Sequence, residues 1–321
     1  MAEAPLFAEL VGQSLAIQLL QAALQRGRLA PAYLFAGPEG VGRRLAALRF
    51  LEGVLTGGRG QPELRRRLAQ GNVADLLWLE PTYQHQGQLV GVSLAEEMGV
   101  SRRSPAQIRL EQVREVSRFL ARRPIESPRP LVVIESAEAM AEPAANALLK
   151  TLEEPGEGLL ILLSSAPEKL LVTIRSRCQR IPFQPLSPSL MAEVLARTTP
   201  PEEARVRQPD APQLLAMAAG SPGALLMHRH QWERLPEGLA ARLGDLPPNP
   251  LGALELARDI SEGLDGDQQL WLLNWWQAGL WQSHRDPRQM DRLEVLRRHL
   301  LSHVQPRLAW EVTLLELGLI R

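Results

Sequence analysis

The chain has 321 residues, of which 45% are hydrophobic and 22% are charged, a mixture typical of folded globular proteins rather than of disordered or fibrous ones. Its 36 basic and 36 acidic residues cancel, which excludes a long-range attraction toward nucleic acid or an anionic membrane. The single cysteine, Cys178, excludes an intrachain disulfide and a zinc site built from several thiolates.

The length and the distribution of apolar residues set further limits. A chain of this size exceeds one ordinary hydrophobic core, so we expect two or three compact domains. No stretch approaches the ~18 consecutive apolar residues of a membrane span, and the amino terminus shows no charged segment followed by an apolar one. We therefore expect a cytoplasmic protein with no membrane partner.

The first half of the sequence alternates short apolar runs with helix-period segments. A strand at 32–36 meets a glycine-rich turn at 37–42, and a helix is predicted from Arg43 to about Leu55. Further predicted strands and helices are listed in chain order: strand 76–79, helix 108–120, strand 131–134, helix 143–152 and strand 159–163. This alternation predicts an α/β domain with a parallel sheet covered by helices.

Polar and proline-rich stretches divide the rest of the chain. The stretches 57–71 and 81–105 are punctuated by Gly and Pro and are predicted to be surface insertions, to which we assign no role. After the prolines at 182, 185 and 188 the sequence is helix-like to its end. We expect three domains, at 1–185 (α/β), 186–232 (small, helical) and 236–321 (helical).

The glycine-rich turn has the spacing of a phosphate-binding loop without its chemistry. In such a loop, glycines let backbone N–H groups converge on phosphate oxygens, a lysine reaches the β and γ phosphates, and a Ser or Thr holds Mg²⁺. Here Gly37, Gly40 and Gly42 are present, but the next two residues are Arg43 and Arg44. A planar guanidinium is a poor replacement for the lysine ammonium, and a cation at position 44 cannot coordinate magnesium.

A second metal-binding motif is also degenerate. The strand at 131–134 ends in Glu135-Ser136, where an active P-loop ATPase has Asp followed by Glu, the so-called Walker B pair. Ser136 cannot act as the base, and Glu135 taken alone is as consistent with a helix-capping or salt-bridging residue as with a relic of the motif. We therefore expect no ATP hydrolysis, no productive cofactor binding and no metal, while residual nucleotide binding stays open.

Three runs in the α/β segment resemble a known family, and the residues at 11–13 and 32–42 add to the likeness. The runs are Ala-Ala-Asn-Ala-Leu-Leu-Lys-Thr-Leu-Glu-Glu-Pro at 144–155, Pro-Glu-Lys-Leu-Leu at 167–171 and Ile-Arg-Ser-Arg-Cys-Gln at 174–179. They are similar to those of the AAA+ clamp-loader subunits, specifically the delta-prime type of bacterial DNA polymerase III. The resemblance covers residues 6–185, and beyond 185 it rests on length and helical character.

The resemblance implies an AAA+ P-loop fold followed by a helical lid and a helical collar domain. It also implies that Arg177, within Ser176-Arg177-Cys178, is an arginine finger presented to ATP bound in a neighbouring subunit. The expected partners are the ATPase subunits and the delta-type subunit of a clamp loader, with the sliding clamp and primer-template DNA reached through the complex. The alternative for Arg177 is an ion pair with an acid on its own domain surface.

Several positions depart from the family pattern. Gly223 stands where active members have a lid arginine, Ser164-Ser165 stands at the position of a γ-phosphate sensor, and the four zinc-binding cysteines of many relatives are missing. The tryptophan-rich run at 270–281 is interpreted as core or interface packing rather than base stacking, and Arg297-Arg298-His299 as a solvated helix face.

Two other functions remain open from the sequence. The chain could be an active AAA+ clamp-loader ATPase in which Arg43 replaces the lysine, or an AAA+ adaptor outside replication. Tight Mg²⁺-dependent nucleotide binding by the isolated chain favours the first alternative, and failure to co-purify with clamp-loader subunits favours the second.

Overall fold

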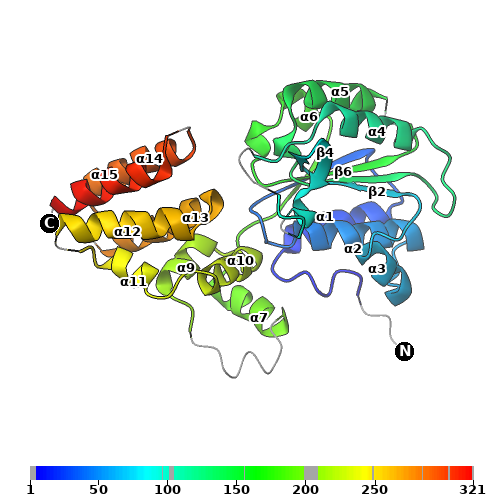
Figure 1. Cartoon of the computed structure of the whole chain (residues 1–321). Coiled ribbons are helices and arrows are strands. Elements are labelled where there is room, and N and C mark those ends of the chain that lie inside the picture. Colours follow the sequence, from blue (N-terminus) through cyan, green and yellow to red (C-terminus); the bar gives the residue numbers. More distant parts are fainter. Residues whose placement is uncertain are drawn as a thin grey trace. The chain divides into compact units, whose positions relative to one another are not determined.

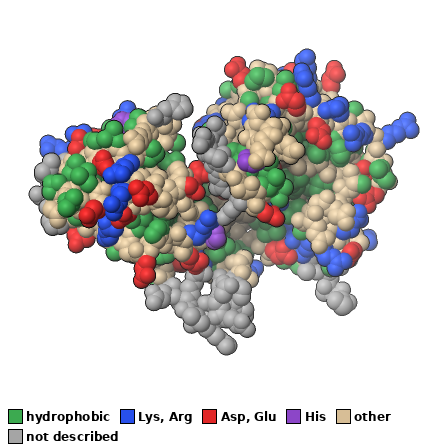
Figure 2. All heavy atoms as spheres, viewed as in Figure 1, with side chains coloured by type: hydrophobic (Ala, Val, Ile, Leu, Met, Phe, Trp, Pro, Cys, Tyr) green, Lys and Arg blue, Asp and Glu red, His purple; other side chains and the backbone are tan. Residues whose placement is uncertain are grey.

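The computed structural model describes residues 5–95, 97–100, 105–154, 156–198, 209–247, 249–283, 285–302 and 304–319. Its internal contacts divide the chain into two units. Unit 1 comprises Met1–Pro200 with Gly220–Pro222, and unit 2 comprises Pro201–Ala219 with Gly223–Arg321. Figure 2 shows basic and acidic side chains interspersed on the visible face of each unit, in keeping with the cancelling charges of the sequence.

Unit 1 is built on a five-stranded sheet in which all neighbouring strands are parallel (Figure 1). The strands lie in the order β2-β5-β6-β1-β7. Their bounds are β1 Ala32–Ala36, β2 Leu76–Leu79, β5 Leu131–Ile134, β6 Leu159–Ser164 and β7 Gln179–Pro182. Parallel strands place all their carboxyl ends on one edge, where the loops after β1, β5 and β6 meet.

Helices cover both faces of this sheet, as the apolar runs predicted. Along β1, Tyr33 and Phe35 are buried with α1 and α2, whereas Leu34 is buried with α4 and α5, because successive strand residues point to opposite faces. The helices of unit 1 are α1 Ser14–Gln25, α2 Arg43–Thr56, α3 Pro62–Ala69, α4 Leu110–Leu120, α5 Glu142–Glu153, α6 Val172–Arg175 and α7 Pro188–Thr198. Short 3₁₀ turns lie at 92–94, 137–139 and 167–169.

The structure corrects the sequence prediction at one place and adds detail at two others. The prolines after 181 do not follow the last predicted strand directly, because β7 comes between and pairs with β1 as an edge strand. The stretch 57–71 contains α3, and 81–105 contains the antiparallel hairpin β3 (Thr82–His85) and β4 (Gln88–Gly91). Within the latter stretch, residues 96 and 101–104 lie outside the described residues, as does Pro155 of the family motif.

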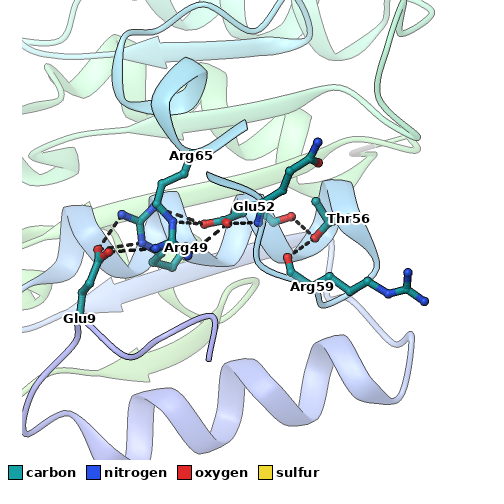
Figure 3. A network of polar contacts seen from close by, with 7 residues as sticks. Glu9, Arg49, Glu52, Thr56, Arg59 and Arg65 are labelled. Atoms are coloured by element: carbon teal, nitrogen blue, oxygen red, sulfur yellow. Dashed lines mark hydrogen bonds and ion pairs between the residues drawn. The ribbon is translucent and has the colours of Figure 1, made fainter. Parts of the chain in front are cut away.

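An ionic network fastens α3 to α2 (Figure 3). The carboxylate of Glu52, whose side chain is 0% exposed, accepts hydrogen bonds from Arg49 (3.3 Å), Arg65 (3.0 Å) and the backbone N–H of Gln61 (2.7 Å). Both arginines also donate to Glu9, at 2.7 and 2.9 Å. A charge buried this completely needs several donors, and this network supplies them.

The regular secondary structure among the described residues of unit 2 is all helical. Its helices are α9 Pro212–Ala218, α10 Pro222–Glu233, α11 Leu239–Gly244, α12 Pro250–Gly263, α13 Gly266–Ser283, α14 Pro287–Leu300 and α15 Pro306–Leu319, with α10 beginning in unit 1. The helices α9, α12 and α14 each have a proline in their first turn. The side chains of Asn249 and Asp286 accept backbone hydrogen bonds and cap α12 and α14. None of the helices in the described part of the chain combines the length and apolar character that crossing a membrane requires.

The tryptophans of α13 are mostly core residues, as the sequence predicted. Trp271, Trp275 and Trp276 are buried, while Trp281 is half exposed. Trp275 packs against Trp232 with ring centroids 5.2 Å apart. Arg297 corrects the prediction of a solvated face, because its half-buried guanidinium reaches Asn274 and Gln277 on α13.

The three-domain division stays a prediction. The helical segment 186–232 includes residues 199–208, which lie outside the described residues. The described part of unit 2 runs from α9 through α15 and agrees with a helical carboxy-terminal half.

Candidate degenerate nucleotide site

The loop after β1 has the backbone of a phosphate-binding loop. Gly40 and Gly42 have φ values of 75° and 102°, a conformation that glycine adopts without strain. At Gly37 an added Cβ would lie 2.2 Å from the carbonyl oxygen of Phe183, so only glycine fits there. The N–H of Gly37 donates to the carbonyl of Ser164 at 3.1 Å, which ties the loop to the end of β6. The predicted loop geometry is therefore present.

Side chains from distant parts of unit 1 hold this loop by its carbonyl groups. The Gln13 amide donates to the carbonyls of Val41 (3.3 Å) and Gln184 (2.8 Å). Ser221, just before Gly223 and the first turn of α10, donates its hydroxyl hydrogen to the carbonyl of Glu39 at 2.6 Å. The loop is thus fixed from both sides without a ligand.

Arg44 and Glu135 form an ion pair across the carboxyl edge of the sheet. Arg44 Nη1 lies 2.7 Å from Glu135 Oε2, and the same oxygen accepts a hydrogen bond from Trp78 Nε1 at 2.8 Å. The Arg44 guanidinium also stacks over the Trp78 ring, 4.6 Å from its centroid. We call these three residues the Arg44–Glu135–Trp78 contact. Glu135 therefore forms a salt bridge, which is one of the roles that the sequence left open for it.

Arg43 lies half-buried beside three carboxylates. Burial lowers the pKa of its guanidinium, while the charges of Glu138, Glu39 and Glu135 act in the opposite direction. Its Nε and Nη1 atoms are buried and have no hydrogen-bond partner among the described residues. The two arginines of the loop thus face three glutamates, so this edge of the sheet carries no surplus of positive charge to attract a triphosphate.

Glu138 is a site residue that the sequence did not reveal. It lies in the 3₁₀ turn after β5 and accepts hydrogen bonds from the backbone N–H (2.9 Å) and the hydroxyl of Ser165. Burial alone would raise the pKa of Glu138, but hydrogen bonding from Ser165 is the chief cause that holds it below its ordinary value. Ser165, which stands at the position of a γ-phosphate sensor, thus donates its hydrogen bonds to a carboxylate of the same chain.

Two further site residues were missed for a common reason. Trp78 belongs to β2, and Gln13 precedes α1, so each reaches the loop only through the fold.

For Glu138, the sequence did contain a signal. Glu135 and Glu138 are three positions apart after a predicted strand, and a turn at the end of a strand brings such residues to the same edge of the sheet.

The Ser176-Arg177-Cys178 triplet forms the turn after α6. Arg177 Nη1 donates to the carbonyl of Thr173 (3.1 Å), and Nη2 lies 3.0 Å from Glu153 Oε1 at the end of α5. Ser176 donates its hydroxyl hydrogen to the same Thr173 carbonyl at 3.1 Å. The Arg177 side chain is 37% exposed, so its guanidinium reaches solvent while making the surface ion pair that the sequence allowed as an alternative.

Cys178 is a buried, free cysteine that packs with the core on the α4–α5 face of the sheet. Burial raises the pKa of its thiol to about 12, so the thiol is protonated at neutral pH and is a poor nucleophile. Its burial anchors the turn that carries Arg177.

A protein-family model described as "DNA polymerase III, delta subunit" matches residues 12–187. A second model, "Cyanobacterial DNA polymerase III delta prime, C-terminal domain", matches residues 189–317. The chain belongs to the DNA polymerase III delta-prime family. The delta-prime assignment thus extends the likeness seen at 6–185 into the helical half of the chain.

Curated relatives agree with this family. The chain is 37% identical to DNA polymerase III subunit delta' of Pseudomonas aeruginosa over 206 residues, which cover 61% of this chain and 55% of the relative. It is 34% identical to subunit delta' of Bacillus subtilis over 185 residues, covering 56% and 50%. The chain spans about half the length of these two relatives. The gamma/tau subunit of Mycobacterium bovis is 32% identical over 217 residues, covering 67% of this chain and 35% of that protein.

Among solved structures, the fold resembles a DNA polymerase III gamma subunit-related protein from Thermotoga maritima. The TM-score is 0.56 with 16% identity, covering 94% of this chain and 98% of that one. This delta-prime family member therefore has the AAA+-like fold, a parallel α/β domain followed by an all-helical region.

Proposed function

We propose that the chain is a non-catalytic, delta-prime-type subunit of a clamp loader of the DNA polymerase III holoenzyme. In this proposal it hydrolyses no ATP itself and offers Arg177 to ATP bound in a neighbouring ATPase subunit. The observation that carries the absence of hydrolysis is the Arg44–Glu135–Trp78 contact, in which an arginine of the same protein pairs with the remaining carboxylate of the second metal motif.

The electrostatics of the contact support the absence of hydrolysis. Phosphoryl transfer depends almost wholly on positioning and on cations that neutralise the developing charge, chiefly Mg²⁺. Glu135 is the one acidic residue left in the second metal motif, and it already accepts hydrogen bonds from Arg44 and Trp78. To bind Mg²⁺ it would have to leave both donors, while Arg44 would repel the ion.

The exposure of Arg177 supports a role outside its own subunit. A guanidinium is charged at any physiological pH and presents a planar fork of donors that suits phosphate oxygens. Among the described residues, the ionic partner of Arg177 is Glu153, whose side chain is 54% exposed. Such surface pairs contribute about 0–1 kcal/mol, so a neighbour's phosphates could replace Glu153 at little cost.

The proposal includes a division of labour along the chain. Residues 1–185 form the AAA+ P-loop domain, 186–232 the lid and 236–321 a collar that holds neighbouring subunits together. The partners are ATPase subunits and a delta-type subunit, with the sliding clamp and primer-template DNA reached through the complex. The helical character of unit 2 and the family match at 189–317 support this division.

Replacement of Arg177 in a reconstituted loader tests the proposal. We expect Arg177→Ala to reduce single-turnover hydrolysis at the one site that receives the finger by about 10³-fold, a magnitude typical of arginine fingers. Assembly, followed by gel filtration, should be unchanged because the residue is exposed. Arg66→Ala is the matched control, since Arg66 is also an exposed arginine paired with a glutamate, Glu63, at 2.8 Å.

Unchanged hydrolysis in the Arg177→Ala complex would show that Arg177 does not act as an arginine finger. Failure of the unaltered chain to assemble with clamp-loader subunits would overturn the proposal as a whole.

A further inference from the structure

Unit 2 contains a groove where α11 packs against α13, two helices labelled in Figure 1. Its volume is about 450 Å³, within the roughly 300–1,000 Å³ typical of ligand pockets. Nine described residues line it, from the end of α10, the connection 235–238, α11 and one position of α13. All nine belong to unit 2, and the proposed function gives this groove no role.

Two tryptophans form the aromatic part of the groove. Trp232 on α10 is half-buried and Trp275 on α13 is buried, and their ring centroids lie 5.2 Å apart with an angle of 46° between the ring planes. The face of an indole ring carries a negative partial charge and attracts cations more strongly than the rings of Tyr or Phe. The aromatic lining therefore suits a ligand that combines a flat or apolar body with a positive charge.

A single carboxylate sets the charge of the groove. Glu237 is the one charged residue among the nine described residues that line it. It is exposed, and it forms no ion pair with another residue in the described part of the chain. An unpaired carboxylate beside two indole rings attracts a cation and repels phosphate groups. Nucleic acid is thus a poor occupant, because its binding depends on basic residues at the phosphates.

Small residues leave the groove open along α11 (Leu239–Gly244). Gly238, Ala240, Ala241 and Gly244 are part of its lining. An added Cβ at Gly238 or at Gly244 would meet no atom within 4 Å, so the space beside both positions is free. A polypeptide backbone can therefore approach this helix closely, and the volume of the groove leaves room for residues on either side of one inserted side chain.

Unit 1 shows which cation completes a tryptophan–glutamate arrangement in this protein. There the Arg44 guanidinium lies 4.6 Å from the centroid of the Trp78 ring and 2.7 Å from the Glu135 carboxylate. A planar, weakly hydrated guanidinium can stack on a ring and pair with a carboxylate at once, whereas the compact ammonium of lysine is strongly hydrated. Trp232 and Glu237 supply the same two partners without the arginine.

We infer that this groove, lined by Trp232, Trp275 and Glu237 and here called the Trp232–Glu237 groove, binds an arginine side chain presented by another polypeptide. The guanidinium stacks on the indole rings and pairs with Glu237, while the flanking residues of the partner lie along α11. The inference stands apart from the proposed function, since it concerns unit 2 alone and requires neither an arginine finger nor the absence of hydrolysis.

NMR spectroscopy of the full chain with ¹⁵N-labelled tryptophan tests the inference. The seven indole N–H signals are assigned with single Trp→Phe variants, and the peptide acetyl-Ala-Ala-Arg-Ala-Ala-amide is titrated in. We expect saturable shifts of the Trp232 and Trp275 signals and none of the Trp78 signal, because that ring already carries Arg44. The same peptide with citrulline, a neutral isostere of arginine, should bind about tenfold more weakly.

Substitutions at exposed positions locate the site without disturbing the core. Glu237→Gln should weaken binding of the arginine peptide about fivefold, whereas Glu255→Gln, at an exposed position of α12 outside the groove, should leave it unchanged. Ala241→Arg places a guanidinium four positions after Glu237, so it should occupy the groove from the same chain and weaken peptide binding at least tenfold. Ala241→Gln is the matched control and should bind the peptide as the unaltered chain does.

Four outcomes would overturn the inference. Equal affinity for the citrulline peptide would show that apolar contact alone drives binding, and guanidinium ion binding as tightly as the peptide would indicate a site for small cations. Shifts confined to Trp78, or no shift at millimolar peptide, would show that the Trp232–Glu237 groove binds no arginine. Each of these results leaves the proposed function standing, because that proposal is tested by ATP hydrolysis in the assembled loader.

Discussion

Two arginine–glutamate pairs of unit 1 have the same chemistry and different consequences. Arg44–Glu135 has a separation of 2.7 Å and a third member, Trp78, which donates to the carboxylate and stacks under the guanidinium. Arg177–Glu153 has a separation of 3.0 Å, and its carboxylate is more exposed, at 54% against 26% for Glu135. In our proposal, the first pair closes the degenerate nucleotide site, while the second leaves its arginine able to change partner.

The difference teaches that the surroundings of an ion pair decide what it does. A pair reinforced by an indole N–H and a ring face resists exchange with an external ion, whereas a solvated pair exchanges readily. Four predictions test this comparison.

The largest effect on stability is expected for the ion pairs of Glu52, whose side chain is fully buried. Glu52→Gln leaves Arg49 and Arg65 with one carboxylate, that of Glu9, and should lower the free energy of unfolding by about 3 kcal/mol. Urea denaturation measures the loss. Glu63→Gln is the control, because its pair with Arg66 is exposed and should contribute nearly nothing. Equal losses in both variants would show that burial does not set the energy of these pairs.

The second largest effect is expected for ATP binding at the Arg44–Glu135–Trp78 contact. Arg43→Lys with Arg44→Thr restores a lysine and a metal-binding hydroxyl and releases Glu135, so we expect Mg²⁺-dependent ATP binding to strengthen at least tenfold, about 1.4 kcal/mol. Isothermal titration calorimetry measures it. Arg44→Lys is the matched control, since it keeps a cation beside Glu135 and should bind no better than the unaltered chain. No gain in the double variant would mean that the arginines are not what closes the site.

A smaller, pH-dependent effect is expected from a neutral contact in unit 2. His228 Nδ1 accepts a hydrogen bond from Trp271 Nε1 at 3.0 Å, and burial lowers the pKa of His228, against a raising effect of a backbone hydrogen bond with Met217. The unfolded chain therefore binds a proton more readily, so stability is constant above the unfolded pKa of ~6.5 and falls as pH drops toward the lowered folded pKa.

Thermal or urea unfolding between pH 7.5 and 5 measures this dependence. His228→Gln should flatten the part of the profile below pH ~6.5 relative to the unaltered chain. Added salt should have little influence on the His228–Trp271 contact, in contrast to the ionic pairs. A profile that His228→Gln does not alter would contradict the assignment.

The smallest effect is expected for the open pair. Glu153→Gln should change the free energy of unfolding by less than about 0.5 kcal/mol, because both side chains are partly exposed to solvent, at 37% and 54%. Hydrolysis by the assembled loader should persist, since Arg177 remains. A loss above about 1 kcal/mol would show that Arg177 serves its own subunit as a structural residue.

The sheet and its degenerate loop could be predicted because their signals are local. Ala32–Ala36 is a continuous apolar run, and Gly37, Gly40 and Gly42 have the spacing of a loop that needs glycine. β7 could not be recognised, because Gln179–Pro182 has two polar residues and a proline and forms a strand only by pairing with β1 at the sheet edge.

The candidate site could be predicted only in part. The sequence showed that Arg43 and Arg44 replace the reactive residues, but not that Arg44 would bind Glu135, since the partners are 91 positions apart. Trp78 and Glu138 enter the site from β2 and from a 3₁₀ turn, and α3 is fixed by charges on α2 that a local pattern does not reveal. Long-range polar contacts of this kind depend on the topology of the sheet.

ATP turnover by the purified full-length chain, alone and at saturating ATP and Mg²⁺, tests the central claim most directly. The proposal predicts a rate no higher than that of the Glu135→Gln variant measured in the same assay. A catalytic rate of ATP hydrolysis that disappears in the Arg43→Ala variant would contradict the claim, because Arg43 would then replace the missing lysine in catalysis.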